Sequence, residues 1–397
     1  MRLVLFDWAQ GGHHPIYIRR FAEALTSSME ISVADPDSTL TELGDLQAEM
    51  IPLGRGRPRD VNERMRNRTR DSVRREIELL AHAADRAAAD HVLHLYADSI
   101  VPSLATTRSR GIRLTTLLFY PRAHYPDAFG VQLPVAERVR AAAKEAAVSG
   151  WRRRRDAHAV MTLDEEAARR WSAKRGAPAY WVPEPTIESA PLSVPASARS
   201  GCILYGALAD RNGIDLLARA IISEPTPIRV TVAGEPDSGY LPRLQELLAE
   251  MRRGGASVEL HAHRHTESEG LHALASARCA VLPYPRHDGM SRVLVEACSV
   301  GTPVIVHDYG LLAHFVRRYG LGLVVDCNDS RAFRNALLEL TTNADATERY
   351  AASLSGFAAR FSRERFAEAV AKPFLGDAGA AVEQRPPATI RLHTRRG

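Results

Sequence analysis

The sequence predicts an α/β protein with two consecutive domains, each built on a parallel sheet. Short apolar runs alternate along the chain with stretches rich in Ala, Arg, Glu and Leu, which is typical of βα units. The alternation stops once, in the proline-rich segment Tyr180–Ser200, and then begins again. The chain has 397 residues, which is enough for two domains of about 150–200 residues with separate cores.

The first domain is expected to span residues 1–182. It opens with the apolar strand Arg2–Phe6 and a helix from about Pro15 to Ser27. An arginine-rich stretch, Gly54–Glu76, leads into a helix that continues to Asp90. The other expected elements are the strands Ile31–Asp35, His91–Tyr96, Arg113–Tyr120 and Ala157–Leu163, and the helices Ala136–Ala147 and Glu165–Arg175, the last capped by Asp164.

A linker is expected at residues 183–200 and the second domain at residues 201–360. The first strand of this domain, Gly201–Gly206, ends in glycine and precedes the helix Asp215–Ile222. Further strands read IRVTVAG, SVELHA, CAVLPYP, TPVIVHD and GLGLVVD, with helices between them. Residues 361–375 are expected to form a last helix, and residues 376–397 a mobile tail. Open parallel sheets bind ligands at the carboxyl ends of their strands.

The composition is that of a soluble globular protein. Apolar residues make up 45% and charged residues 25%, which excludes a disordered chain, a collagen and a small disulfide scaffold. No apolar run is long enough for a transmembrane helix or a signal peptide. The four cysteines form no CxxC pair, so we expect reduced thiols in the cytoplasm. The excess of Arg over Lys, together with abundant Ala, indicates a GC-rich bacterial gene.

The segment Cys279–Asp308 carries the most chemical information. An apolar strand is followed by the loop RHDGMS, and a helix starts near Arg292. Gly289 permits a tight turn, so the free N–H groups of Met290, Ser291 and Arg292 are expected to face a ligand crevice. The N-terminus of a helix is an anion site, and phosphate is its usual guest.

Two carboxylates flank this helix start in an acid-x7-acid spacing. Asp288 precedes the turn and Glu296 lies one turn inside the helix. Both are therefore able to face one bound ligand. Because carboxylates are strong acceptors, their expected partners are the hydroxyls of a sugar or a ribose.

This segment resembles the donor-binding signature of retaining glycosyltransferases of the glycogen-synthase-like family four, also called glycosyltransferase group 1. That family shows the pattern E-G-F-G-x-x-x-x-E, then a small-residue helix and GTPVI. Here the pattern stands as Asp288-Gly289-Met290-Ser291, then Glu296, then Gly301-Thr302-Pro303-Val304-Ile305. The resemblance covers Gly201–Leu340, where GCILYGALADRNGIDLLARA, VTVAGEPDSGYLPRLQELL and VELHAHR follow in the order that the family has.

The resemblance implies the GT-B fold, an α/β architecture in which two Rossmann-like doubly wound domains face each other across a cleft. The last helix would cross back to the first domain. Glu296 would hold the nucleotide ribose, and Asp288 would hold hydroxyls of the transferred sugar. The amides of Met290, Ser291 and Arg292 would hold the diphosphate. The expected donor site further includes Gly206, Gly289 and Arg264, the last of them near the base.

One departure from the family concerns positive charge. The family places Arg and Lys in the pattern G-R-L-x-x-x-K-G after the first strand of this domain, whereas this chain has Ala207 and Asn212 there. Transfer needs positive charge on the leaving diphosphate, because its negative charge grows in the transition state. Arg211 and Arg292 are the expected replacements for these basic residues. If neither supplies the positive charge, it is expected to come from the region near Arg122 and His13.

The first domain resembles the family only weakly, as acceptor domains do. The run Gly11–His14 follows the first strand, so Gly11 and Gly12 are expected near the donor phosphates, and His13 and His14 near the acceptor. His124 follows a strand, where many relatives carry a histidine near the reacting sugar, so we expect it to be catalytic together with Asp288. Tyr125 is expected at the acceptor.

We therefore expect a cytoplasmic, metal-independent, retaining transferase that moves a sugar from a UDP- or GDP-sugar to a small polar acceptor. No cofactor and no nucleic acid partner are expected, and the lone DxD string Asp35–Asp37 is interpreted as a turn rather than a metal motif. Two alternatives remain open. One is a peripheral membrane transferase that builds a lipid-linked or surface glycan, with Arg55–Arg75 at the membrane. The other is a nucleotide-sugar-binding protein without transferase activity.

Overall fold

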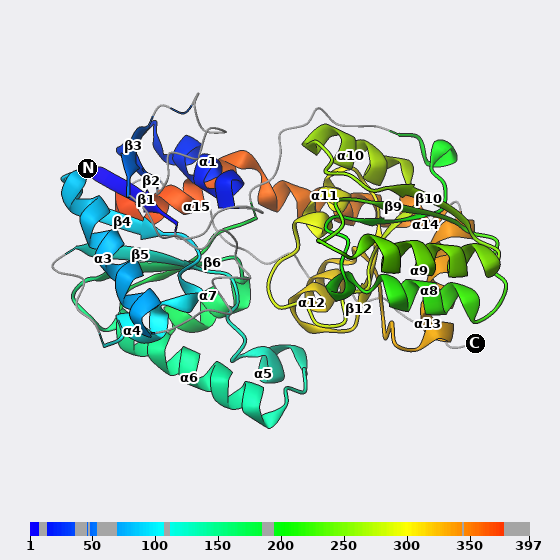
Figure 1. Cartoon of the computed structure of the whole chain (residues 1–397), viewed down its shortest axis with the longest axis horizontal. Coiled ribbons are helices and arrows are strands. Elements are labelled where there is room, and N and C mark those ends of the chain that lie inside the picture. The colour runs from blue at the N-terminus through cyan, green and yellow to red at the C-terminus, as the bar shows by residue number, and fades with distance from the viewer. Residues whose placement is uncertain are drawn as a thin grey trace.

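The computed structural model of the chain describes residues 1–7, 14–35, 46, 48–53, 70–106, 112–184, 194–343 and 345–376, without the side chains of residues 35, 70–72, 196 and 346–347. Figure 1 shows the two domains side by side, each with a central sheet between helices. This arrangement confirms the α/β, doubly wound fold that the alternating pattern predicts.

The first domain is built on a seven-stranded parallel sheet. Its strand order is β3-β2-β1-β4-β5-β6-β7, so the direction of winding reverses between β1 and β4. The strands are β1 (Arg2–Phe6), β2 (Glu30–Asp35), β3 (Glu49–Pro52), β4 (His91–His94), β5 (Arg113–Leu118), β6 (Ala157–Thr162) and β7 (Ala179–Trp181). The helices are α1 (His14–Leu25), α3 (Arg70–Arg86), α4 (Val101–Leu104), α5 (Tyr125–Phe129), α6 (Val135–Arg152) and α7 (Glu165–Ser172).

The second domain is built on a six-stranded parallel sheet with the order β10-β9-β8-β11-β12-β13, and its winding reverses between β8 and β11. The strands are β8 (Cys202–Tyr205), β9 (Arg229–Ala233), β10 (Ser257–His261), β11 (Cys279–Leu282), β12 (Val304–His307) and β13 (Gly322–Val325). The helices are α8 (Ile214–Ile222), α9 (Leu241–Arg253), α10 (Glu267–Ser276), α11 (Arg292–Ser299), α12 (Gly310–Tyr319), α13 (Ser330–Thr342) and α14 (Asp345–Ala358).

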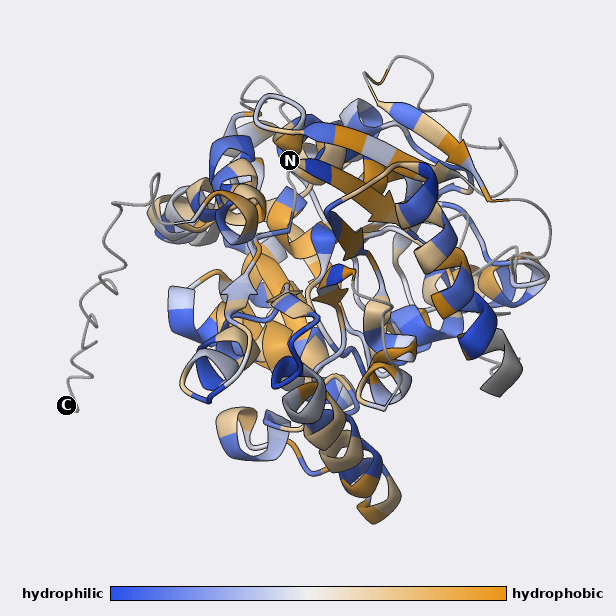
Figure 2. Ribbon diagram, turned by 90° about the vertical axis from the view of Figure 1, so that its left-hand side faces the viewer, coloured by the Kyte–Doolittle hydropathy of each residue, from blue (hydrophilic) through white to orange (hydrophobic). Residues whose placement is uncertain are grey.

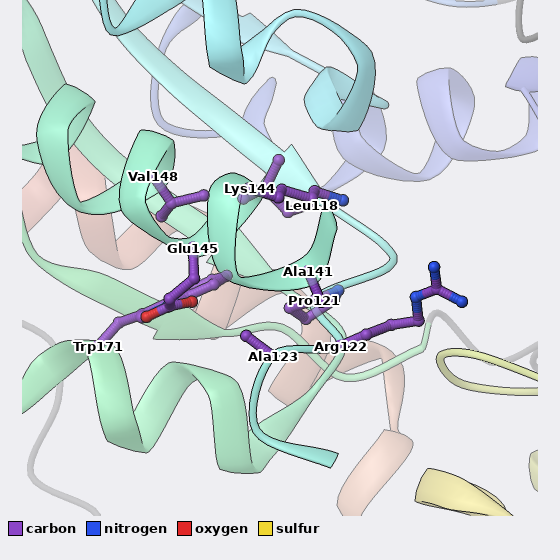
Figure 3. Close-up of a pocket in the computed structure, with 9 residues that line it drawn as sticks. All are labelled: Leu118, Pro121, Arg122, Ala123, Ala141, Lys144, Glu145, Val148 and Trp171. Atoms are coloured by element: carbon purple, nitrogen blue, oxygen red, sulfur yellow. The ribbon is translucent and has the colours of Figure 1, made fainter. Parts of the chain in front are cut away.

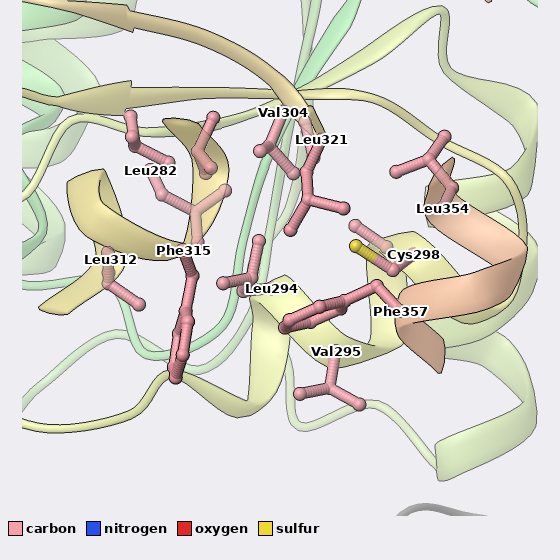
Figure 4. Packing of buried hydrophobic residues seen from close by; sticks show 14 of the residues in the cluster. Leu282, Leu294, Val295, Cys298, Val304, Leu312, Phe315, Leu321, Leu354 and Phe357 are labelled. Carbon is pink, nitrogen blue, oxygen red and sulfur yellow. The ribbon is translucent and has the colours of Figure 1, made fainter. Parts of the chain in front are cut away.

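Each sheet is covered by apolar side chains on both faces, and Figure 2 shows apolar strands in the interior with polar residues on the outer helices. Figure 4 shows one face of the second domain, where Phe315 of α12 and Phe357 of α14 pack against α11. The four cysteines are buried and form no disulfide. A buried reduced cysteine packs like a small apolar side chain.

Two helices of the described chain pack against the domain to which they do not belong. Helix α15 (Arg363–Leu375) follows the second domain and packs on α1, where Phe366 lies edge-on to Phe21 at 5.1 Å between ring centroids. In Figure 1 it runs from the second domain back along the first. In the other direction, Tyr125 of α5 belongs to the same buried cluster as α11 and α12. Each domain therefore contributes apolar residues to the other.

Several boundaries differ from the expectations. Residues Phe119 and Tyr120 leave the sheet after β5 because their N–H groups donate to the Asp98 carboxylate instead. Strand β7 overlaps the first two residues of the proline-rich segment Tyr180–Ser200 and ends before residue 183, where the linker is expected to begin. Strand β3 and helix α14 were not predicted. The expected cap is present, since the Asp164 carboxylate accepts from the Ala167 N–H at 2.9 Å. Residues 54–69 of the arginine-rich stretch and residues 377–397 lie outside the described residues.

Candidate active site

The topology brings two loops of the second domain together at one edge of its sheet. Strands β8 and β11 are neighbours at the point where the winding reverses, so the loops that follow them start side by side. Gly213, which caps α8, lies so close to the loop after β11 that a Cβ atom there would be 2.2 Å from the Pro283 carbonyl oxygen. A switch point of this kind is where open α/β sheets bind ligands.

The loop between β11 and α11 also touches the first domain. Gly289 has a φ of 95°, and a Cβ atom there would lie 2.8 Å from the Phe119 carbonyl oxygen. Glycine is therefore required both by the backbone conformation and by the close approach of the first domain. The Gly289 N–H donates to the Tyr125 hydroxyl at 2.9 Å, so α5 holds this loop in place.

Asp288 lies between the two domains. Its carboxylate accepts from Arg122 of the first domain at 2.8 Å and from the Tyr309 hydroxyl at 3.2 Å. Figure 3 shows Arg122 extending away from a small pocket of the first domain, towards the second domain. The predicted sugar-binding carboxylate is thus paired with a cation that comes from the first domain.

The start of α11 has the features of an anion site. Ser291 at the N-cap is in an extended conformation, and its side chain makes no capping hydrogen bond to the helix. Its hydroxyl instead hydrogen-bonds Tyr284. The Met290 side chain packs against the apolar clusters of both domains. The first N–H groups of α11 are therefore not capped by a side chain at the place where the two domains meet.

Arg292 is the central charge of the site. Its guanidinium donates to Glu296 at 2.7 Å and to Glu267 of α10 at 2.9 Å. Burial acts to lower the pKa of Arg292, but the two carboxylates outweigh it, and the pKa lies above its usual value. Burial raises the pKa of Glu296, and Arg292 opposes that rise. Glu267 in turn lies 3.4 Å from Arg20 of α1, which connects this charge cluster to the first domain.

Of the other predicted donor residues, Gly206 lies next to α11. Gly206 follows β8, and a Cβ atom there would contact Val293 of α11 at 3.4 Å, so this glycine faces the start of α11. Arg211 is exposed and forms an ion pair with Asp237 at 2.5 Å. Arg264 is exposed on the segment after β10. Arg292 and Arg211 thus both have carboxylate partners in this structure.

His14 is buried in the first domain rather than exposed to an acceptor. Its Nδ1 lies 2.6 Å from the Asp7 carboxylate, and its ring packs on Tyr96 at 3.9 Å between centroids. Its Nε2 is buried and makes no hydrogen bond with a described residue. Tyr96 has a left-handed backbone with φ of 58°, which is unusual for a residue with a side chain. Gly11, Gly12 and His13 lie outside the described residues.

His124 and Tyr125 are buried where α5 begins. His124 Nε2 lies 3.1 Å from the Asp164 carboxylate, but the two atoms are not aligned for a hydrogen bond. The rings of Tyr125 and Phe129 pack against the imidazole. Tyr125 is fully buried, and its hydroxyl accepts from the Gly289 N–H, so it supports the loop between β11 and α11 and is not exposed to an acceptor. The packing of His124 is that of a structural histidine.

We expect His124→Ala to lower the free energy of unfolding by about 1–3 kcal/mol, because it leaves the Asp164 carboxylate buried without its neighbour. Denaturant unfolding of the wild type and the variant measures this. Phe129→Leu, which changes the same packing and keeps the imidazole, is the control. A lower kcat for His124→Ala at unchanged stability would instead support the catalytic role that its position after a strand predicts.

Glu184, Tyr120 and Glu267 are parts of this site that the sequence reasoning did not identify. Glu184 lies three residues after the end of β7 and is buried, and burial raises the pKa of its carboxyl to about 7. Tyr120 follows β5 and contacts the position of Gly289. An acidic residue between two prolines at the end of a strand, in WVPEP, was the available signal for Glu184.

In the part of the chain that the structure describes, no group of three or more His, Cys, Asp and Glu side chains is placed to hold a metal ion. Within the same residues, every helix is too short or too polar to cross a membrane.

Comparisons with known proteins agree with this geometry. Residues 200–353 match the model of the family described as "Glycosyl transferases group 1". A D-inositol 3-phosphate glycosyltransferase of Corynebacterium urealyticum is 31% identical over 145 residues, which cover 36% of this chain and 34% of that relative. The match therefore spans about a third of the length of this relative.

Solved structures match over nearly the whole chain. Sucrose-phosphate synthase from Thermosynechococcus elongatus has a TM-score of 0.64 at 18% identity and covers 92% of this chain and 96% of its own. Anabaena Alr3699/HepE in complex with UDP has a TM-score of 0.66 at 15% identity and covers 94% and 99%. At these identities the likeness concerns the fold.

The two Rossmann-like domains and the site between them define a protein with the GT-B fold. The match to the family described as "Glycosyl transferases group 1" lies in the second domain, which it covers from residue 200 to residue 353. The resemblance inferred from Cys279–Asp308 is thereby confirmed.

Proposed function

We propose that the chain transfers a sugar from a UDP- or GDP-sugar to a small polar acceptor, with retention of configuration at the anomeric carbon. The observation that carries this proposal is the strand–loop–helix from β11 to α11. It presents Asp288, an uncapped helix start and the buried Glu296 to the first domain. One structural neighbour is described as a complex with UDP and glucose, which supports a nucleotide-sugar donor.

In this proposal the donor replaces contacts that the protein now makes with itself. The ribose hydroxyls donate to Glu296, and the diphosphate lies at the start of α11, next to Arg292. The sugar hydroxyls donate to Asp288, where Arg122 and Tyr309 now bind. When the bond between sugar and diphosphate breaks, the negative charge of the leaving diphosphate grows, and Arg292 stabilises it.

We expect transfer to proceed without a divalent metal ion, because arginines and a helix start supply the positive charge. Rates measured with excess EDTA and with added Mg²⁺ or Mn²⁺ should agree within about twofold, a change of under half a kcal/mol in the barrier. A mixture of donor, acceptor and EDTA-treated protein, followed by liquid chromatography, measures this. A strict requirement for either ion would contradict the metal-independent proposal.

The proposed acceptor is a small polar molecule in the cytoplasm of a bacterium. The curated relative is named for D-inositol 3-phosphate, a molecule of that kind, and this supports the proposal. The alternative acceptor is a membrane lipid. Binding to anionic vesicles that weakens with salt would favour it, whereas indifference to vesicles would favour the small polar acceptor.

One observation favours a protein that binds nucleotide sugars without transferring them. The chain has Ala207 and Asn212 where the family pattern has basic residues, and Arg211 pairs with Asp237. Slow hydrolysis of the donor in the absence of an acceptor would argue against this alternative.

Incubation of the purified chain with a panel of UDP- and GDP-sugars and mixed small acceptors, read by mass spectrometry, tests the proposed function. A product heavier than the acceptor by one sugar residue is the expected result. NMR of that product measures the anomeric configuration, and inversion would contradict the retaining mechanism. Nucleotide binding without any product would favour the binding protein.

A further inference from the structure

Two arginines, one from each domain, hold the same carboxylate. Arg20 of α1 donates to one oxygen of Glu267 at 3.4 Å, and Arg292 of α11 donates to the other oxygen at 2.9 Å. Figure 1 shows α1 and α10, which begins at Glu267, on the facing sides of the two domains. The Glu267 carboxylate therefore lies between two guanidinium groups that come from separate domains.

The three side chains differ in how freely they can move. Arg20 and Arg292 are largely buried, with 15% and 19% of their side-chain surface exposed, whereas the Glu267 side chain is 39% exposed. Phe21, the residue after Arg20, is fully buried and packs on Phe366 of α15, which fixes this part of α1. Glu267 is thus the member of the group that can turn out to solvent without moving a buried side chain.

The position between the two arginines suits a phosphate group. Guanidinium groups bind carboxylates and phosphates in the same way, because both anions offer a pair of oxygen acceptors that matches the fork of N–H donors. Of two such anions, the one with the larger negative charge is attracted more strongly by two cations. Arg292 also stands at the uncapped start of α11, where the diphosphate of the proposed donor lies.

We propose that Arg20 is a further binding residue for the diphosphate of the donor, which displaces Glu267 and lies between Arg20 and Arg292. This inference rests on the proposed function of the site. No covalent bond changes in this step, since one anion exchanges for another and Glu267 turns to solvent. Arg20 then supplies from the first domain a positive charge that the second domain lacks at Ala207 and Asn212.

Isothermal titration of the full chain with UDP and with GDP tests the role of Arg20. Arg20→Gln keeps part of the side chain and removes its charge. We expect it to bind about tenfold or more weakly than the wild type, because a charge-assisted hydrogen bond to the diphosphate is lost. Arg19→Gln is the matched control, since Arg19 is the neighbouring residue of α1 and pairs with Glu23 at 3.8 Å. Its affinity should stay within about twofold of the wild type.

Removing the competing carboxylate should have the opposite effect. Glu267→Gln keeps the size of the side chain but leaves no negative charge between the two arginines, so we expect it to bind UDP and GDP about threefold or more tightly than the wild type. Glu246→Gln, which neutralises an exposed acid of α9, is the control for a general loss of negative charge and should leave the affinity unchanged. Because Glu267 is partly exposed, this variant keeps the inference testable if Arg20→Gln does not fold.

The double variant separates direct binding from positioning. If Arg20 only holds Glu267 in place, Arg20→Gln has no effect in the Glu267→Gln background. If Arg20 binds the diphosphate, it weakens binding by about tenfold in that background as well. Uridine and guanosine lack phosphate, so their binding should be the same in the wild type and in Arg20→Gln.

Unchanged affinity for UDP and GDP in folded Arg20→Gln, or a loss that disappears in the Glu267→Gln background, would overturn this inference and leave the proposed function standing. An equal loss for uridine and guanosine would overturn it too, since Arg20 would then contact the base or the ribose. Unchanged or weaker binding by Glu267→Gln would have the same consequence, because the carboxylate would not compete with the diphosphate. A wild type that binds neither UDP nor GDP would overturn the proposed function, and the inference with it.

Discussion

Replacing Glu296 by alanine should weaken the binding of a nucleoside diphosphate by about 2–4 kcal/mol, or roughly 30- to 700-fold, because hydrogen bonds to a charged group are worth about 1.5–3 kcal/mol each. The Glu296 side chain is buried at the start of the proposed donor site and is held by Arg292 at 2.7 Å. In the proposed donor complex, a carboxylate held in this way binds both ribose hydroxyls with little loss of side-chain freedom. Titration of the folded variant with UDP and GDP measures the loss.

Two comparisons make the Glu296 experiment specific. Glu296→Gln keeps the size of the side chain and one acceptor oxygen, so its loss should be intermediate. Glu246→Ala removes an exposed acid of α9, far along the chain from the site, and should leave the affinity unchanged. Unchanged affinity in Glu296→Ala would exclude the ribose role.

Removing Arg292 should slow transfer by about tenfold or more, because a positioned cation stabilises the leaving diphosphate by a few kcal/mol. A cation at the start of a helix is locally unfavourable against the helix dipole. Here two carboxylates compensate it, and in the donor complex the diphosphate does so. Rates at saturating donor, measured for Arg292→Ala against the wild type, give the effect on kcat.

Arg211 is expected to show the same direction of effect, about tenfold or more. It lies on the loop after β8 and pairs with Asp237 in this structure, so it must leave that partner to reach the diphosphate. If both arginines hold one diphosphate, the double variant should be less impaired than the sum of the single effects. Arg243→Ala, on the exposed face of α9, is the control for loss of a surface charge.

Rates within about twofold of the wild type for both single variants would contradict this assignment, since that is under half a kcal/mol of the barrier. The cation would then come from the first domain. Arg122, which already binds Asp288 at 2.8 Å, is the residue that the structure offers for that role.

The sequence predicted those parts of the fold and the site that are set by interactions between residues close together in the chain. The apolar runs, the caps and the glycine before α11 set the elements locally, so Asp288, Gly289 and Glu296 could be placed on one strand–loop–helix. Strand β3 was missed because only Ile51 among its four residues is buried, which leaves little alternation to detect. Strand β5 was predicted too long because its competitor for hydrogen bonds, Asp98, lies on another segment.

The sequence by itself determined the two α/β halves, the family signature of the second domain and the absence of basic residues at Ala207 and Asn212. Only the tertiary structure decided which charged and polar groups pair with one another. Arg122 meets Asp288 across 166 positions of sequence, and the Gly289 N–H meets the Tyr125 hydroxyl across 164. Such pairs produce no periodic pattern in the sequence, because they depend on how the two domains pack against each other. The burial that places the pKa of Glu184 at about 7 arises at the same junction.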